Sequence, residues 1–152
     1  MALPTVGAPA PDFTLASTAG TPVTLSALRG KNVLLAFFPL AFTRTCTAEV
    51  CAFSEDYDRF AAAGTVVLPI SCDSVPTLKA YQKAENITVD LLSDFKRDVS
   101  RSYGTLIEDK FHSSRAYILI DRTGVVRWVH EEAELGHRRE NGELLAQIAA
   151  LG

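Results

Sequence analysis

A continuous apolar run at residues 33–38, Val-Leu-Leu-Ala-Phe-Phe, constrains the fold of this chain more than any other feature. A strand with one face in water alternates apolar and polar residues, whereas a strand buried on both faces is apolar throughout. Such strands occur mainly in parallel sheets that helices cover on both sides. The run therefore predicts a central strand in a layered α/β structure.

Strand and helix patterns alternate along the rest of the chain. Residues 13–15 and 23–25 flank a turn-rich stretch and predict an N-terminal β-hairpin. Pro69 removes a ladder donor from its strand, which predicts that this strand lies at a sheet edge or carries a bulge. The remaining elements are predicted as strands at 65–71, 116–120 and 125–129, a short apolar piece at 91–92, and helices at 46–63, 74–85, 96–103 and 143–151.

This order of elements indicates an α/β sandwich of the thioredoxin type, with a central mixed β-sheet flanked by helices and an N-terminal β-hairpin. Periodicity by itself supports only the α/β class. No repeat or linker interrupts the sequence, so we expect residues 1–152 to form a single domain.

Charge and hydropathy exclude several classes of function. The net charge of -3 and the pI near 5.6 provide no basic surface for nucleic acid. The N-terminus lacks the pattern of a signal peptide, and no apolar run approaches the roughly 18 residues that span a membrane. We therefore expect a cytoplasmic protein without a membrane partner. Structural disulfides are rare in that compartment, so close cysteines there serve redox chemistry or metal binding more often.

Two of the three cysteines stand five residues apart, at Cys46 and Cys51. Cys46 lies in the first turn of the helix predicted at 46–63, where the free N–H groups and the helix dipole favour a thiolate. It continues the apolar stripe of that helix, so its sulfur should face a pocket rather than open water. In an intact helix the two Cα atoms would be about 8.7 Å apart, whereas a disulfide requires less than about 7 Å. The helix must therefore unwind locally before the two sulfurs can join.

A lowered thiol pKa by itself would not make such a cysteine fast. A drop from about 8.5 to about 6 raises the thiolate fraction at neutral pH about 30-fold, and the loss of nucleophilicity takes back roughly 10- to 18-fold. Fast chemistry requires neighbouring groups that align the substrate and stabilise charge on its leaving oxygen.

The segment Pro39-Leu40-Ala41-Phe42-Thr43-Arg44-Thr45-Cys46 resembles the motif of the peroxiredoxins, in which a proline, three residues, a threonine and two residues precede a cysteine. The resemblance extends from the opening at residues 8–15 to residues 115–121. Residues 38–43 look like the E-type alkyl hydroperoxide reductases. The position of Cys51 is similar to that of the resolving cysteine in bacterioferritin comigratory protein, also called peroxiredoxin Q.

The resemblance implies a role for each residue that matches the motif. Cys46 would be the peroxidatic nucleophile, and Thr43 would orient the peroxide. Pro39 would shield the sulfur from water, and Arg115 would stabilise the thiolate and polarise the peroxide.

Two further residues are assigned by the same resemblance to the surroundings of the nucleophile. Glu49 is similar to an acidic residue often found three positions after the cysteine, and Arg139 is its predicted partner.

The resemblance also implies a catalytic cycle, in the service of antioxidant defence. The Cys46 thiolate attacks hydrogen peroxide or an organic hydroperoxide and becomes a sulfenic acid, which Cys51 converts to an intramolecular disulfide. A thioredoxin- or glutaredoxin-type protein then reduces that disulfide. Neither a metal nor an organic cofactor is needed. The implied assembly is a monomer or a homodimer, with Phe42 as a candidate contact.

Other interpretations of the cysteines remain open at this stage. Cys51 could be a structural helix residue, which would make the chain a one-cysteine peroxiredoxin that uses an external thiol. A disulfide oxidoreductase on the same fold is disfavoured because that chemistry uses a Cys-x-x-Cys pair. A non-catalytic binding domain would leave peroxide unconsumed. Cys72 is interpreted as a core or pocket-rim thiol, and a zinc site that combines the three cysteines with His112 lacks ligand spacing.

Overall fold

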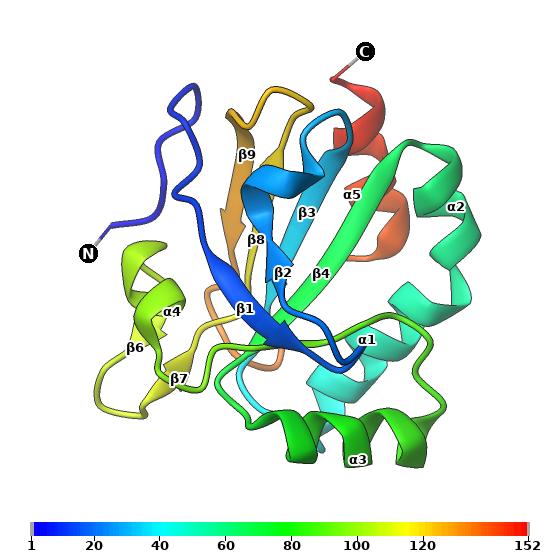
Figure 1. The fold of residues 1–152 in the computed structure, drawn as a ribbon, viewed down its shortest axis with the longest axis vertical. Helices are drawn as coiled ribbons and strands as arrows, with labels where there is room; N and C mark the ends of the chain where they lie inside the picture. The colour runs from blue at the N-terminus through cyan, green and yellow to red at the C-terminus, as the bar shows by residue number, and fades with distance from the viewer. Residues whose placement is uncertain (1, 152) are drawn as a thin grey trace.

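The computed structural model describes residues 2–151 and contains one seven-stranded sheet with helices on both faces (Figure 1). The strand order in the sheet is β2-β1-β5-β4-β3-β8-β9. Two further strands, β6 and β7, form a separate two-stranded sheet. The strands are β1 (Thr14–Ser17), β2 (Val23–Thr24), β3 (Asn32–Phe37), β4 (Thr65–Ser71), β5 (Leu92–Ser93), β6 (Leu106–Ile107), β7 (His112–Ser113), β8 (Ala116–Ile120) and β9 (Val126–Glu131). The helices are η1 (Leu25–Leu28), α1 (Arg44–Glu55), α2 (Tyr57–Ala62), α3 (Val75–Glu85), α4 (Asp98–Ser102) and α5 (Asn141–Ala149).

Strand β3 lies inside this sheet, and all of its residues are buried, as its continuous apolar sequence predicted. It pairs in parallel with β4 and antiparallel with β8, so the sheet is mixed. The predicted N-terminal hairpin is present, because β1 and β2 pair antiparallel. The strands predicted at 116–120 and 125–129 correspond to β8 and β9, which pair antiparallel with an irregular register between Leu119 and Ile120.

Alternate side chains of β3 enter two separate apolar cores. Leu34 and Ala36 face the core that includes residues of α1, α2, α3 and α5. Val33 and Leu35 face the other core, together with the N-terminal segment and α4. Each face of the sheet is thus closed by its own helices, and α1 belongs to only one of the two cores.

The helix predicted at 46–63 is divided into α1 and α2, and it begins two residues earlier, at Arg44. The break lies at Asp56, whose φ of -102° and ψ of 17° leave the helical region. The Asp56 carboxylate accepts a hydrogen bond from Asn141 Nδ2 at 2.9 Å, at the start of α5. A long-range contact therefore fixes the bend, and such a contact leaves no periodic signal in the sequence.

The prediction that Pro69 marks an edge strand or a bulge is wrong, because β4 lies between β3 and β5 and pairs with β3 without interruption. However, only the last two residues of β4, Ile70 and Ser71, pair with β5. The carbonyl of Ile70 faces β3, where it accepts from Phe38 N, so the neighbouring Pro69 faces the opposite side. The missing N–H of Pro69 thus lies where the neighbouring strand has not yet begun.

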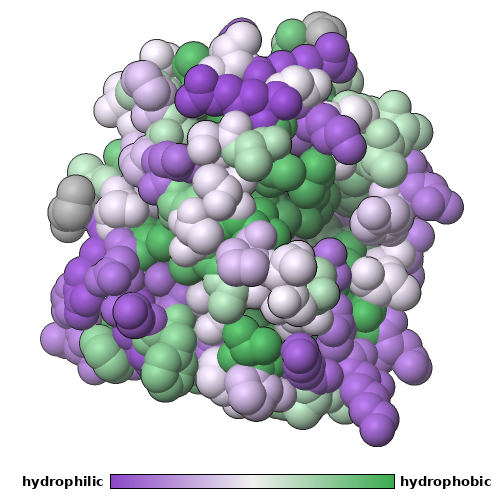
Figure 2. Space-filling view, viewed as in Figure 1, coloured by the Kyte–Doolittle hydropathy of each residue, from purple (hydrophilic) through white to green (hydrophobic). Residues whose placement is uncertain are grey.

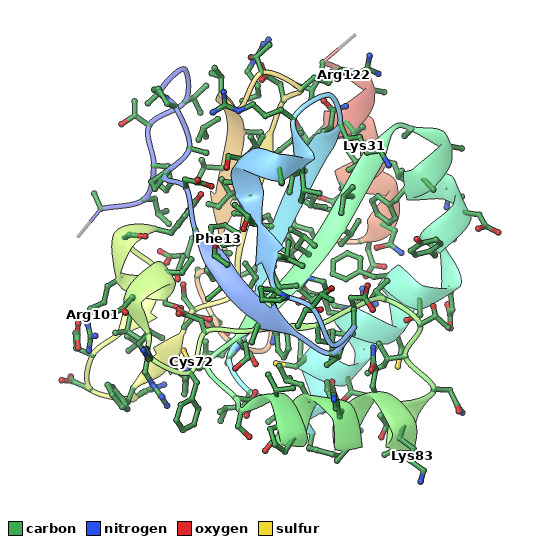
Figure 3. The ribbon with its side chains drawn as sticks, in the orientation of Figure 1. Phe13, Lys31, Cys72, Lys83, Arg101 and Arg122 are labelled. Carbon is green, nitrogen blue, oxygen red and sulfur yellow. The ribbon has the colours of Figure 1, made fainter. Side chains whose placement is uncertain are left out.

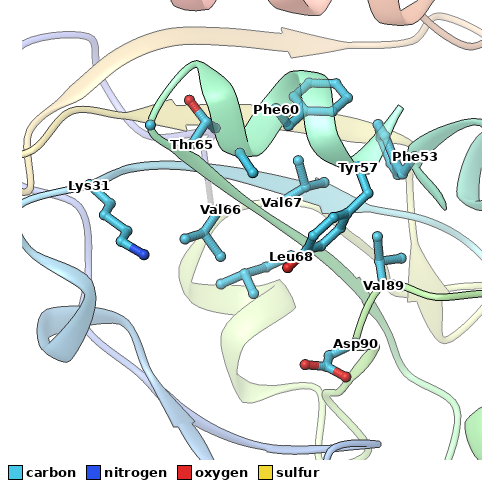
Figure 4. Close-up of a pocket in the computed structure, with 12 residues that line it drawn as sticks. Lys31, Phe53, Tyr57, Phe60, Thr65, Val66, Val67, Leu68, Val89 and Asp90 are labelled. Atoms are coloured by element: carbon cyan, nitrogen blue, oxygen red, sulfur yellow. The ribbon is translucent and has the colours of Figure 1, made fainter. Parts of the chain in front are cut away.

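Apolar residues gather toward the centre of the face drawn in Figure 2, and hydrophilic residues surround them. A cavity of about 170 Å³ opens beside β4 and α2. Figure 4 shows its lining, which includes Phe53, Tyr57 and Leu68 with the charged Lys31 and Asp90. None of the predicted site residues lines this cavity. Within residues 2–151, no helix combines the length and the apolar character needed to cross a membrane.

Candidate active site

The loop between β3 and α1 carries the first part of the predicted site. Pro39 is buried two residues after the end of β3, and Thr43 is the exposed N-cap residue of α1. The Thr43 hydroxyl does not cap the helix but donates to the carbonyl of Leu40 at 2.7 Å. The backbone N–H of Ala41 donates to Asp73 Oδ2 at 2.9 Å. The loop is therefore anchored to the end of β4.

Cys46 lies in the first turn of α1, as predicted, and only 1% of its surface is exposed. Its sulfur accepts a hydrogen bond from Arg115 Nη2 at 3.1 Å. Arg115 directly precedes β8, the strand that pairs with β3, so the sheet brings the guanidinium to the start of the helix. The sulfur is away from open water, as predicted. It is nearly fully buried, however, and does not face an open pocket at the start of the helix.

The Arg115 side chain is also 1% exposed, and it contacts three acceptors. Nη1 donates to Glu49 Oε1 at 3.0 Å, while Nη2 donates both to the Cys46 sulfur and to the carbonyl of Leu135 at 3.1 Å. Nε is buried and has no hydrogen-bond partner among the described residues. Burial lowers the pKa of Arg115, but the charges of Glu49 and Cys46 outweigh that effect and leave the pKa above its ordinary value. The guanidinium is therefore a fixed positive charge beside the sulfur.

Glu49 stands one turn after Cys46 and is 1% exposed. Its Oε2 accepts a hydrogen bond from the hydroxyl of Tyr117. Burial raises the pKa of Glu49, and this effect exceeds the opposing influence of Arg115, Tyr117 and Arg138. The carboxylate thus depends on its donors to stay ionised.

The structure does not pair Arg139 with Glu49, so that prediction is wrong. The Arg139 guanidinium binds Glu132 Oε1 through Nε at 2.6 Å and also reaches Glu143. Only its backbone N–H approaches the site, where it donates to the Tyr117 hydroxyl at 3.0 Å. The preceding residue, Arg138, supplies the second positive charge near Glu49. The pattern of the sequence could not distinguish two adjacent arginines in the irregular segment before α5.

The sequence reasoning missed Tyr117, which is fully buried. Its signal was present, because successive side chains of a strand alternate between faces and those two residues apart share a face. Tyr117 stands two residues after Arg115, so a polar group on that face of β8 could have been assigned to the same site.

Cys51 is partly buried, and its sulfur faces α3, where it lies 3.9 Å from the carbonyl oxygen of Glu85. Burial raises the pKa of the Cys51 thiol, and the nearby carboxylates of Glu85 and Glu55 raise it further. Helix α1 is continuous from Cys46 to Cys51, and both thiols are free. The structure is therefore that of the reduced protein with the helix intact.

Cys72, which is labelled in Figure 3, is buried at the end of β4. Its sulfur lies 3.7 Å from the Ser100 hydroxyl of α4. Burial raises the pKa of this thiol as well. Among residues 2–151, no group of three or more histidine, cysteine, aspartate or glutamate side chains is placed to hold a metal ion. Cys72 is thus a buried thiol beside α4, and the described residues do not bring the three cysteines together with His112 as metal ligands.

Comparison with known proteins identifies the family. The model of the AhpC/TSA family matches residues 6–129. Alkyl hydroperoxide reductase E of Mycobacterium tuberculosis is 38% identical over 149 residues, which cover 96% of this chain and 97% of that protein. The chloroplastic peroxiredoxin Q of Sedum lineare is also 38% identical, over 128 residues that cover 83% of this chain and 68% of that protein. Both predicted subgroups are thus among its relatives.

Solved structures agree with the predicted thioredoxin-like fold. The reduced 2-Cys peroxiredoxin of Plasmodium vivax superposes with a TM-score of 0.90 at 35% identity and covers 97% of this chain and 82% of its own. AhpC of Mycobacterium tuberculosis superposes with a TM-score of 0.89 at 26% identity and covers 98% of this chain and 93% of its own. The chain therefore belongs to the AhpC/TSA family and is a peroxiredoxin, a thiol-dependent peroxidase.

Proposed function

We propose that Cys46 is the residue that attacks the peroxide. Its thiolate sulfur bonds to one peroxide oxygen, the O–O bond breaks, and the other oxygen takes up a proton and leaves as water or an alcohol. Cys46 is thereby oxidised to the sulfenic acid and the peroxide is reduced. The single observation that carries this proposal is the 3.1 Å contact between Arg115 Nη2 and the Cys46 sulfur inside the buried core.

Arg115 then serves both the nucleophile and the leaving oxygen. One N–H of Nη2 stabilises the thiolate, and the unpartnered buried Nε offers a donor to the peroxide. Glu49 fixes the guanidinium through Nη1. Thr43 orients the peroxide from the loop, and Pro39 keeps water from the sulfur.

Access of the substrate requires movement of the cover, because Cys46 is only 1% exposed. The segment between β9 and α5 contributes to that cover. Leu135 accepts a hydrogen bond from Arg115, and the carbonyl of Gly136 accepts a 3.4 Å bond from Thr45 Oγ1. A small peroxide that displaces the carbonyls of Leu135 and Gly136 would accept hydrogen bonds from the donors that these carbonyls release, which are Arg115 Nη2 and Thr45 Oγ1.

Cys51 is the proposed resolving residue. Its thiol attacks the sulfenic sulfur, a disulfide forms, and water leaves. Because α1 holds the two sulfurs on different sides, its first turns must unwind for this step. A thioredoxin- or glutaredoxin-type dithiol protein in the cytoplasm then returns both cysteines to thiols and becomes oxidised itself.

Intact mass and peroxide consumption in cysteine variants test this assignment. One equivalent of peroxide should convert the wild-type thiols to one disulfide, and Cys46→Ser should abolish consumption. Cys51→Ser should form the sulfenic acid but fail to recycle with thioredoxin. Cys72→Ser is the matched control and should behave as the wild type does. Peroxide consumption by Cys46→Ser would overturn the proposal, while recycling by Cys51→Ser would establish the one-cysteine mechanism.

A further inference from the structure

Tyr117 is a buried polar residue that the mechanism above does not use. Its hydroxyl lies between two partners: it donates to Glu49 Oε2 and accepts from the backbone N–H of Arg139 at 3.0 Å. Because the backbone N–H can only donate, the hydroxyl hydrogen is directed to the carboxylate. The direction of this hydrogen bond is therefore fixed by the chain itself.

The carboxylate of Glu49 receives one donor on each oxygen. Arg115 Nη1 occupies Oε1, and Tyr117 occupies Oε2. A buried carboxylate that lacks donors takes up a proton and loses its charge. A neutral Glu49 would hold the guanidinium of Arg115 less firmly, since the charge-assisted hydrogen bond would become an ordinary one.

The ring of Tyr117 is fixed independently of its hydroxyl. It stacks on His130 of β9 with ring centroids 6.3 Å apart, and His130 in turn stacks on Trp128. Removal of the hydroxyl alone should leave the ring in place. Trp128 is the only tryptophan of the chain and lies 6.4 Å from the Tyr117 ring, so its fluorescence reports on this region.

We propose that Tyr117 is a positioning residue of the peroxidase reaction, whose hydroxyl keeps Glu49 ionised and oriented so that Arg115 stays on the Cys46 sulfur. This inference rests on the proposed role of Cys46. Tyr117 acts indirectly, through its contact with Glu49 and the contact of Glu49 with Arg115, and does not touch the reacting atoms.

The charged and titratable groups around Glu49 set what a pH profile can report. They come from Arg115 and Tyr117 on the β8 side, Arg138 in the segment after β9, and Cys46 one turn earlier on α1. Arg115 keeps its charge over the whole range, because its pKa lies above its ordinary value. Protonation of Glu49 is therefore the event through which Tyr117 affects peroxide attack at acid pH.

Tyr117→Phe tests the proposal, with Tyr103→Phe as the matched control. Tyr103 is also fully buried, and its hydroxyl makes one 2.6 Å hydrogen bond to the carbonyl of Pro11 in the other core. The measurement is the rate of the first oxidation by hydrogen peroxide, followed by Trp128 fluorescence and intact mass from about pH 5 to about pH 9. Tyr117→Phe should slow the reaction about tenfold near neutral pH and move the acid limb of the profile upward by about one to two pH units. Tyr103→Phe should leave the profile unchanged.

A second variant separates positioning from general loosening of the core. Glu49→Gln removes the group through which Tyr117 acts, so adding Tyr117→Phe to it should cause no further slowing. A deficit in Tyr117→Phe that is equal at every pH, or that adds fully to Glu49→Gln, would overturn the proposal. So would a Tyr117→Phe protein that fails to fold, because the hydroxyl would then serve stability. If Cys46→Ser retains activity the proposed function fails first, whereas an inactive Cys46→Ser with an unaffected Tyr117→Phe removes only this inference.

Discussion

At the scale of single residues, the site depends on the shape of one side chain. Arg115 uses a planar fork to reach the Cys46 sulfur, Glu49 and the carbonyl of Leu135 at the same time. A lysine ammonium is a compact charge on a flexible stem and cannot reproduce that fork. Charge and geometry at this position can therefore be separated by substitution.

Arg115→Lys should keep the positive charge and lose the geometry. We expect peroxide attack to slow about 100-fold, the typical loss when one donor to a developing oxyanion is removed. The thiolate fraction of Cys46, followed by its ultraviolet absorbance, should change much less than the rate. A rate that falls only in proportion to the thiolate fraction would contradict the polarising role of Arg115.

Much of this site could be predicted from the sequence. Cys46 and Glu49 lie one turn apart on the same helix, and Arg115 directly precedes a strand that pairs with the strand before that helix. The family resemblance assigned Cys46, Glu49 and Arg115 to one site, and in the structure the Arg115 guanidinium contacts both of the other side chains. Tyr117 stands in an apolar strand, whose pattern predicts a core residue, although its two-residue spacing from Arg115 places both on one face of β8. The error at Arg139 arose in the irregular segment before α5, where neither the helix period nor the strand period applies. There a shift of one residue exchanges Arg138 for Arg139.

At the scale of secondary structure, helix α1 is the element whose stability opposes disulfide formation. Cys46 and Val50 are buried within one core, whereas Cys51 packs at the margin of that core, with its sulfur 3.9 Å from the Glu85 carbonyl oxygen of α3. The two sulfurs can meet only after these contacts open. The rate of resolution should therefore follow the helix stability, while the rate of the first oxidation should not.

Ala48→Gly tests this dependence, because Ala48 is exposed in the middle of α1. Glycine in a helix interior costs about 1 kcal/mol relative to alanine, which should speed disulfide formation about fivefold if opening precedes it. Rapid mixing with peroxide, acid quenching and mass spectrometry separate the sulfenic acid from the disulfide. An unchanged rate of disulfide formation would show that α1 does not need to open.

The β8–β9 turn offers a prediction for stability rather than for chemistry. The Asp121 carboxylate accepts from the N–H groups of Thr123 and Val125 and from Arg127. Burial raises the pKa of Asp121, but these donors and the Thr123 hydroxyl lower it to about 2, below its ordinary value of 3.8. The charged form is therefore the stabilising one, and its contribution is present above about pH 4 and is lost as the pH falls through about 2.

Asp121→Asn should reduce the free energy of unfolding by about 1 kcal/mol at neutral pH, less than the full shift would give because the carboxyl is partly exposed. The difference from the wild type should vanish in strong acid. Thermal melts of both proteins between neutral and acid pH check this result. A difference that is independent of pH would show that the turn is stabilised by shape alone.

Element boundaries were predicted less well than element types, and the reason is the same in each case. The continuous run at β3 identified a buried strand without any tertiary information. The break at Asp56 depends on Asn141 of α5, and the position of Pro69 depends on where β5 begins. Contacts between distant parts of the chain decide such details, and local patterns do not contain them.

At the scale of the whole molecule, the two cores differ in what oxidation does to them. Helix α1 supplies Cys46, Val50 and Phe53 to one core and contributes nothing to the other. Unwinding of α1 should therefore loosen one face of the sheet and leave the opposite face intact. The oxidised protein should remain folded around β3 but be less stable than the reduced protein.

The disulfide itself cannot offset this loss. A bridge between Cys46 and Cys51 closes a very short loop, which is worth about 2 kcal/mol. Removing the packing of Val50, which lies between the two cysteines, together with that of Cys46 costs about 2–5 kcal/mol. We therefore expect the melting temperature to fall by about 5–10 °C on oxidation, together with part of the helical circular dichroism signal. Cys51→Ser treated with one equivalent of peroxide is the control, because its sulfenic acid leaves α1 intact and should leave both signals nearly unchanged. Equal melting temperatures and helical signals in the reduced and disulfide forms of the wild type would mean that the two sulfurs join without unwinding the helix.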